Sequence, residues 1–201
     1  MESKDSFLKE DMNKTLSDSL VHDELANLKK ITDIDNSISC EIDGLVYCNA
    51  NEVHVKEVAE LWANLASVQQ MFAPDRYDFK SQDKNWRKFV ISKLEKKHNL
   101  LLVRYKKGES EIRGFLYLQT ITLPTSDLII KGVIEDIYTK PQYRRQSISS
   151  NLLDVALGWT EKQNIKQVDL ITLTKTKDLL QFYLSFIKKF KRNINLELIT
   201  I

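Results

Sequence analysis

The chain has 201 residues, of which 42% are hydrophobic and 29% are charged. This composition is typical of one globular domain and excludes a wholly disordered or fibrous chain. The formal net charge is only +2, and no run of five or more basic residues occurs. The basic face that a nucleic-acid-binding protein needs is therefore missing, and we expect no nucleic-acid partner.

Location and metal binding can also be addressed from the composition. No stretch approaches the roughly 18 apolar residues of a membrane helix, and the first residues are acidic where a leader would be apolar or basic. We therefore expect no membrane partner and a cytoplasmic location. The two cysteines, Cys40 and Cys48, and the three scattered histidines lack the spacing of a metal site or of a nucleophile triad. We expect free thiols and no metal.

Residues 1–40 differ in composition from the rest of the chain. They contain nine acidic and five basic residues, with apolar residues at three-to-five-residue spacing among Ser, Asp and Lys. This weak amphipathic pattern predicts an N-terminal extension that is helical or partly disordered, followed by one domain over residues 41–201. The extension is either a docking helix, for a partner or for a second copy of the chain in a homodimer, or a poorly ordered tail.

From residue 41 onward, strand and helix periodicities alternate. Residues 42–48 predict a short strand. A first helix follows over residues 55–66, with Asn51 as a possible cap, and a second helix follows over residues 86–94.

The second half of the chain begins with three β-rich runs joined by short turn segments, which favours antiparallel strands. These runs are residues 100–105, 112–122 and 128–139. A helix over residues 152–160 then ends near Gln163 and Asn164, where asparagine can adopt a left-handed cap. The last predicted elements are a strand at 168–173, a helix at 179–190 and a strand at 194–201.

The strand, helix and strand between residues 128 and 173 imply a parallel crossover, because a connection of that length joins parallel strands. The predicted fold class is therefore α/β (α+β). We expect a mixed, mostly antiparallel sheet with one parallel β-α-β crossover and helices on both faces.

The most informative segment is a strand that ends in a basic loop and continues into the helix at 152–160. A helix N-terminus carries unpaired N–H groups and a partial positive charge, and Arg144 and Arg145 add cationic donors beside it. The turn is therefore a candidate phosphate site. The serines at 147, 149 and 150 either donate to an anion or simply cap the helix.

This segment resembles the GNAT N-acetyltransferase superfamily, and the resemblance covers the chain from the first predicted strand onward. It rests on the element order and on Glu135-Asp-Ile-Tyr followed by Pro141 and Tyr143. The family signature, Gln/Arg-x-x-Gly-x-Gly/Ala, falls on residues 144–149, which read Arg-Arg-Gln-Ser-Ile-Ser. Both glycine positions of the signature are therefore serine in this chain.

The resemblance implies acetyl-CoA as co-substrate, with its pantetheine arm along the strand end and its pyrophosphate in the loop. The residues assigned to it in this way are Ile137, Tyr138, Thr139, Arg144, Arg145, Gln146, Ser147, Ile148, Ser149, Ser150 and Thr176. A serine that replaces a glycine costs about 1 kcal/mol or more if its φ is positive, and little if the position is an ordinary helical one.

Two catalytic candidates follow, Tyr183 from the same resemblance and Glu135 from the chemistry of acetyl transfer, which needs a carboxylate near the amine. Tyr183 would protonate the departing thiolate; alternatively, it is simply part of the core. Glu135 is the candidate base, on a strand face shared with Val133 and Ile137; alternatively, it lies at a solvated strand end and takes no part in the chemistry. Asp136 points the opposite way unless a bulge resets the register.

We therefore expect an N-acetyltransferase that moves an acetyl group from acetyl-CoA to an amine of a small molecule or peptide by direct attack. The alternatives are a catalytically degenerate GNAT fold that acts as a CoA-sensing or protein-binding module, and an unrelated α+β scaffold without a CoA site. An active enzyme should show diverging strands at 128–139 and 168–173, with Tyr183 opening between them. Three acids that border the expected acceptor side hint at a cationic amine: Asp75, Asp78 and Asp83.

Overall fold

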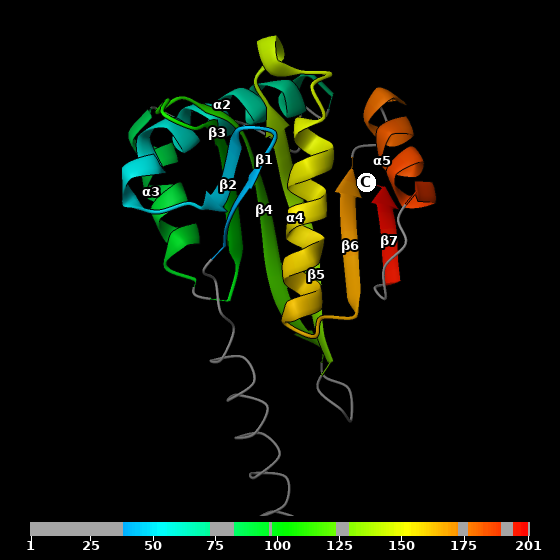
Figure 1. Ribbon diagram of the computed structural model, residues 1–201. Helices are drawn as coiled ribbons and strands as arrows, with labels where there is room; N and C mark the ends of the chain where they lie inside the picture. The colour runs from blue at the N-terminus through cyan, green and yellow to red at the C-terminus, as the bar shows by residue number, and fades with distance from the viewer. Residues whose placement is uncertain are drawn as a thin grey trace, which may run out of the picture. The chain divides into compact units, whose positions relative to one another are not determined.

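The computed structural model (Figure 1) describes residues 38–72, 83–96, 98–123, 129–172, 177–189 and 195–200. Most of the expected N-terminal extension, residues 1–37, lies outside the described residues, so its character stays a prediction. The first strand already begins at Ser39, slightly before the domain start that we expected at residue 41.

In the described part of the chain, seven strands form one sheet and lie in it in chain order. They are β1 (Ser39–Ile42), β2 (Leu45–Asn49), β3 (Leu100–Lys106), β4 (Ile112–Leu123), β5 (Ile129–Thr139), β6 (Gln167–Thr172) and β7 (Asn195–Thr200). The helices are η1 (Glu52–His54), α2 (Val55–Phe72), α3 (Asp83–Leu94), η2 (Pro141–Tyr143), α4 (Ile148–Lys162) and α5 (Lys177–Lys189).

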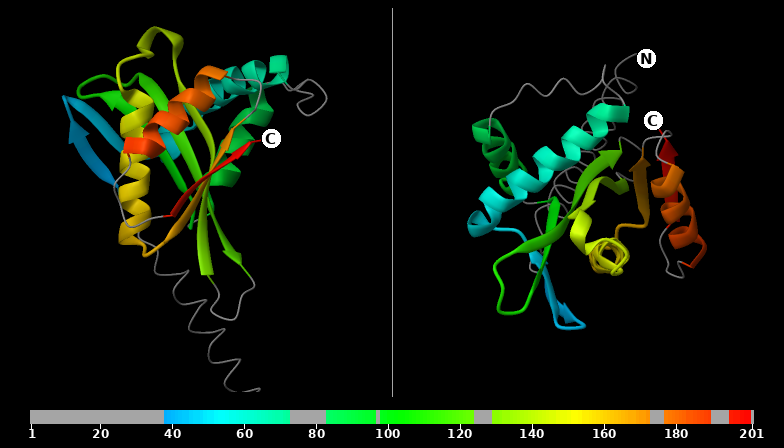
Figure 2. Two further views of the ribbon diagram at one scale, coloured as in Figure 1. Left: turned by 90° about the vertical axis from the view of Figure 1, so that its right-hand side faces the viewer. Right: turned by 90° about the horizontal axis from the view of Figure 1, so that it is seen from above.

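The pairing of the strands confirms the predicted fold class. Strands β1 to β5 pair antiparallel, and β5 pairs parallel with β6 across the α4 connection. Helices α2 and α3 cover one face of the sheet, and α4 and α5 lie on the other (Figures 1 and 2). The sheet also contains a second parallel pair, β6 with β7, which the expectation of one parallel crossover did not include.

The strand expected over residues 42–48 is confirmed for its second part, β2, but its first three residues belong to a hairpin. Ile42 pairs with Leu45, so only Asp43 and Gly44 form the turn between β1 and β2. Both turn residues have positive φ, 52° and 71°, which is the type I′ geometry that Asp-Gly favours in two-residue hairpins. The hairpin adds an edge strand, β1, that the sequence pattern had merged with β2.

Two predicted caps are confirmed. The Asn51 side chain accepts a hydrogen bond from the Val53 amide at the start of η1, and His54 Nδ1 accepts one in return from the Asn51 amide. At the end of α4, Asn164 adopts a positive φ of 58°. Both helical boundaries therefore follow from local side-chain chemistry.

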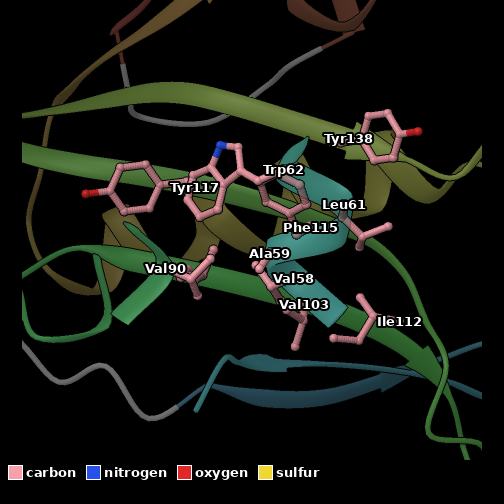
Figure 3. Packing of buried hydrophobic residues seen from close by; sticks show 11 residues of the cluster. Val58, Ala59, Leu61, Trp62, Val90, Val103, Ile112, Phe115, Tyr117 and Tyr138 are labelled. Carbon is pink, nitrogen blue, oxygen red and sulfur yellow. The ribbon is translucent and has the colours of Figure 1, made fainter. Parts of the chain in front are cut away.

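The core between the sheet and helices α2 and α3 is built around aromatic rings (Figure 3). Trp62 of α2 lies between Tyr117 and Phe115 of β4, with ring centroids 5.6 and 4.8 Å away. The Trp62 ring also meets Phe89 of α3 at 4.9 Å. Pairs at such distances add to the stabilisation from burial alone. Trp62 is thereby held in one orientation, which fixes the direction of its indole N–H donor.

Gly114 of β4 is the position where the sheet tolerates no side chain. A Cβ there would lie 2.7 Å from the Tyr138 carbonyl oxygen and 3.2 Å from Ile148 Cγ2. Backbone and buried core cannot move aside at low cost, so we expect Gly114→Ala to lower the free energy of unfolding by about 1–3 kcal/mol. Urea denaturation measures this.

Gly132→Ala of β5 is the matched control for that substitution. The nearest atom to a Cβ there is a side-chain methyl, Val168 Cγ2, at 3.3 Å, so we expect a smaller loss. Equal losses in the two variants would contradict the argument from the close approach of the Tyr138 backbone.

Candidate functional site

The two central parallel strands separate halfway along their length. Residues Lys131–Ile134 of β5 pair with Gln167–Leu170 of β6, and the pairing stops there. Beyond it, β5 continues to Thr139 and pairs with β4. The divergence expected of these strands is therefore confirmed, and among the described residues the edge of β5 that faces β6 has no strand partner from Glu135 onward.

A β-bulge lies at the point of divergence. Asp136 is opposite Tyr117 and Ile134 is opposite Leu118, so Glu135 is one extra residue in β5. Because side chains alternate only in a regular strand, the bulge turns both carboxylates to the face covered by α2 and α3. The expectation that Asp136 points away from Glu135 holds only without a bulge and does not apply here.

The bulge also corrects the expected neighbours of Glu135. Its carboxylate forms an ion pair with Lys93 of α3, at 3.5 Å, whereas Thr139 contacts Ser149 of α4 on the opposite face, Oγ to Oγ, at 3.0 Å. Ile137 lies two residues before Thr139 in the regular part of β5 and so shares the α4 face. Glu135 and Ile137 therefore do not share a face.

Asp136 is held by two donors from α2. Its carboxylate accepts hydrogen bonds from Trp62 Nε1 at 2.9 Å and from Gln69 Nε2 at 3.4 Å. Burial raises the pKa of Asp136, while these two hydrogen bonds partly lower it and the charge of Glu135 raises it further. Of the two adjacent acids, Asp136 is the one whose pKa burial raises, whereas the side chain of Glu135, the acid that the sequence favoured, is 33% exposed.

Tyr183 is the buried side chain of α5, at 2% exposure. Burial raises the pKa of its phenol, and the negative charge of Asp136 adds to the effect. The hydroxyl therefore stays protonated, and it is near enough to Asp136 for the charge to act on it. The ring is part of the core, as one of the two interpretations expected, and its role as a proton donor stays a prediction.

The other end of the unpartnered β5 edge continues into the predicted anion loop. Asn151 N–H donates to the Ser147 carbonyl at 2.9 Å, and this is the first amide of the α4 ladder. The amides of residues 145–150 precede it and have no acceptor in the described part of the chain. Arg144 and Arg145 are exposed beside them, and the Arg144 guanidinium donates to the Thr139 carbonyl at 3.3 Å.

The conformations of the two serines at the signature glycine positions differ. Ser147 is the N-cap of α4 with φ 56° and ψ 15°, a left-handed conformation, and its side chain makes no capping hydrogen bond. Ser149 lies in the first turn of the helix, where serine is ordinary. Only one of the two replacements therefore carries backbone strain, and Arg145, with φ 61°, adds a second left-handed position to the loop.

A charged network that the sequence did not reveal anchors the start of this loop. Lys140 Nζ donates to Glu57 of α2 at 2.8 Å and to Glu111 at 2.9 Å. The Tyr143 hydroxyl donates to the second oxygen of Glu111 at 2.6 Å. These partners come from three distant segments, so no local pattern could have indicated them.

The remaining predicted site residues fall into three groups. Tyr138 is buried in the aromatic core next to Phe115, and Ile148, the first residue of α4, is also buried. Gln146 is exposed and Ser150 is half-buried in the first turn of α4. Thr176 lies outside the described residues, as does most of the acidic loop, including Asp75 and Asp78.

The described part of the chain contains no helix that is both long enough and apolar enough to span a membrane. Within the same residues, no three His, Cys, Asp or Glu side chains gather in a way that could hold a metal ion.

The sequence matches the acetyltransferase (GNAT) family over residues 62–186, which is more than half of the chain. No curated protein matches the chain.

Solved structures of similar fold show the same architecture at low sequence identity. A transcriptional regulator from Bacillus halodurans C-125 is 21% identical with a TM-score of 0.58, covering 73% of this chain and 93% of that chain. A ribosomal-protein-alanine N-acetyltransferase from Brucella melitensis biovar Abortus 2308 is 18% identical with a TM-score of 0.55, covering 70% and 89%. An aminoglycoside acetyltransferase from an uncultured soil metagenomic sample is 17% identical with a TM-score of 0.59, covering 77% and 95%.

Because the two loop serines differ in conformation, we expect glycine at the two positions to change the free energy of unfolding in opposite directions. Ser147→Gly relieves the left-handed strain, so we expect it to raise the free energy of unfolding, by up to about 1 kcal/mol. Ser149→Gly places glycine in a helical turn and should lower it by about 0.5–1 kcal/mol. Urea denaturation of the two single variants measures both free energies. A higher free energy of unfolding in Ser149→Gly would contradict the assigned conformations.

The raised pKa of Asp136 predicts a pH dependence of stability. The folded state holds this proton more tightly than the unfolded chain, so the stabilisation from protonation is present at low pH. It is lost as pH rises from about 4 through the raised pKa. Asp136→Asn removes this contribution, so the stability of the wild type relative to the variant should fall over that interval in urea titrations.

Asp154→Asn, at an exposed position of α4, controls for the loss of one negative charge in that comparison. If the free energy of unfolding of the wild type, relative to that of Asp136→Asn, rose with pH instead, the assigned direction of the pKa shift would be wrong.

Proposed function

Because the chain belongs to the acetyltransferase (GNAT) family, we propose that it is an N-acetyltransferase. It moves an acetyl group from acetyl-CoA to an amine of a small molecule or peptide by direct attack. The observation that carries the proposal is the divergence of β5 from β6 after Ile134. The free edge of β5 has two carboxylates at its start and a loop of unpaired amides at its end.

The loop between β5 and α4 fits the pyrophosphate of acetyl-CoA. The unpaired amides of residues 145–150, the positive end of the α4 dipole and the exposed guanidinium groups of Arg144 and Arg145 are all donors to an anion. The hydroxyls of Ser149 and Ser150 lie in the same turn. When bound, acetyl-CoA supplies a thioester whose carbonyl carbon an amine can attack.

The residues at the divergence provide the proton transfers. The free edge of β5 presents backbone N–H groups that can stabilise a carbonyl oxygen as it gains negative charge. Asp136 or Glu135 accepts the proton of the attacking amine, directly or through one water. Tyr183 keeps its proton because its pKa is raised, and it can give that proton to a departing thiolate.

The acceptor amine is proposed at the level of chemical class. One similar structure is described as a ribosomal-protein-alanine N-acetyltransferase and another as an aminoglycoside 6′-N-acetyltransferase. One name denotes a protein acceptor and the other a small molecule, so both classes stay within the proposal. A cytoplasmic location and docking or dimerisation through residues 1–37 also remain proposals.

Two observations favour the alternative of a degenerate GNAT fold that binds CoA or a protein without turnover. Tyr183 is only 2% exposed, and Ser147 places a side chain where the family has glycine. Neither observation removes the carboxylates or the free amides, so the transferase is our first proposal.

Calorimetric titration with acetyl-CoA and a transfer assay against a panel of primary amines separate the two candidates. We expect the wild type to bind, and Arg144→Ala to weaken binding by about tenfold, the usual effect of losing one charge-assisted contact. Arg87→Ala, at an exposed position of α3, is the matched control. Tyr183→Phe should bind normally and lower kcat by about 10²-fold or more.

Each other result has a defined meaning. Binding without transfer to any amine would favour the degenerate module. Binding only after both serines are changed to glycine would mean that the fold persists while its catalytic function has been lost. No binding in either protein would contradict the CoA site.

A further inference from the structure

The side chain of Lys93 occupies a cation site beside the candidate base. Its ammonium lies 3.5 Å from the Glu135 carboxylate. The same nitrogen lies 4.4 Å from the centroid of the Tyr117 ring and 5.0 Å from that of the Phe89 ring. Two aromatic faces and a carboxylate are the groups that recognise an alkylammonium ion, so the chain holds one of its own primary amines in such a site.

The charge of Lys93 also acts on the second carboxylate, and its side chain is largely shielded from water. Its charge acts on Asp136 and lowers the pKa of that residue, opposing the larger effect of burial. The Lys93 side chain is only 14% exposed. By contrast Lys88, five residues earlier on the same helix α3, is exposed.

The placement of Lys93 relative to Tyr183 suits a transfer reaction. Lys93 approaches the bulge from the face covered by α3, whereas Tyr183 comes from α5, on the opposite side of the sheet (Figures 1 and 2). Glu135, which Lys93 contacts, is the first residue of β5 without a partner in β6. The proposed acceptor amine and the proposed proton donor thus come from helices on opposite faces of the sheet.

We propose that Lys93 is an acetylation site of the chain's own activity, with its side-chain nitrogen as an intramolecular acceptor. This inference rests on the proposed function. The bond from Lys93 Nζ to the acetyl carbonyl carbon forms, and the bond from that carbon to the CoA sulfur breaks. The Lys93 ammonium first loses one proton to solvent by way of Glu135, and the neutral nitrogen then attacks. Glu135 takes the second proton from the nitrogen, Tyr183 gives one to the sulfur, and Glu135 returns its proton to Tyr183, so the products are Nζ-acetyl-lysine, free CoA and one released proton.

The acetylated lysine limits the reaction at this position to one acetyl group per chain. An acetylated lysine has no charge, so it loses the ion pair with Glu135 and the cation–π contacts. Its amide nitrogen is no longer a nucleophile. The reaction therefore stops at one acetyl group per chain at this position.

The test incubates the purified full-length chain with acetyl-CoA that carries an isotope-labelled acetyl group, followed by peptide mapping with mass spectrometry. We expect label at Lys93 about tenfold or more above that at Lys88, because a nucleophile held in place reacts faster than one that must collide with its target. Uncatalysed acetylation would instead favour the exposed Lys88. The labelling rate per chain should not depend on protein concentration.

Two variants sharpen the test. Glu135→Gln keeps Lys93 but removes the base, and should slow labelling at Lys93 by about 10²-fold. Lys93→Arg keeps a cation beside Glu135 but removes the acceptor amine, so label at this position should vanish while acetyl-CoA binding persists. Lys88→Arg is the matched control and should leave labelling of Lys93 unchanged.

The unfavourable outcomes are distinguishable. If acetyl-CoA binds and an added amine is acetylated while Lys93 stays unlabelled, this inference fails and the proposed function stands. Equal label at Lys88, or a rate per chain that rises with protein concentration, also overturns intramolecular transfer to Lys93. If acetyl-CoA neither binds nor transfers its acetyl group, the proposed function fails and this inference fails with it.

Discussion

The bulge at Glu135 is the constraint on which the arrangement of the candidate site depends. Strand side chains alternate between faces, so a regular β5 would send Glu135 and Asp136 to opposite sides of the sheet. One extra residue relative to β4 brings both carboxylates under α2 and α3. The pairing with β6 ends at Ile134, the residue immediately before the bulge. The same step along β5 therefore gathers two acids and frees the backbone edge beside them.

Helix α2 holds both ends of this free edge. Near its start, Glu57 accepts from Lys140, the residue that follows β5 and begins the anion loop. Further along, Trp62 donates to Asp136 while its ring packs in the aromatic core. A rigid helix thus fixes the separation between the two carboxylates, Glu135 and Asp136, and the α4 N-terminus. Core packing, rather than a local loop, sets the geometry that the proposed reaction uses, which is how well-positioned sites are generally built.

Local patterns in the sequence predicted most of the elements but not the contacts between them. The helix and strand periods and the Asn51 and Asn164 caps were readable because each depends on neighbouring residues. The Asp43-Gly44 turn was readable too, because Asp-Gly between apolar residues is a hairpin signal, but both residues were assigned to a single strand. The bulge at Glu135 could not be predicted, because it exists only relative to β4. The contact of Lys93 with Glu135 could not be predicted either, because it forms only when α3 packs on the sheet.

The replacement of glycine by serine in the loop affects the binding of the proposed ligand more than the stability of the fold. The left-handed conformation of Ser147 costs about 1 kcal/mol, and Ser149 is helical and costs little, so the loop keeps its shape without either glycine. The neighbouring Arg145 is also left-handed, which shows that this turn accommodates side chains in that region of conformational space. What glycine would add at position 147 is the absence of a Cβ, and hence a closer approach of backbone amides to a bound anion. The serine signature therefore bears on the affinity of the proposed pyrophosphate site, while the position of α4, and with it the free amides, is preserved.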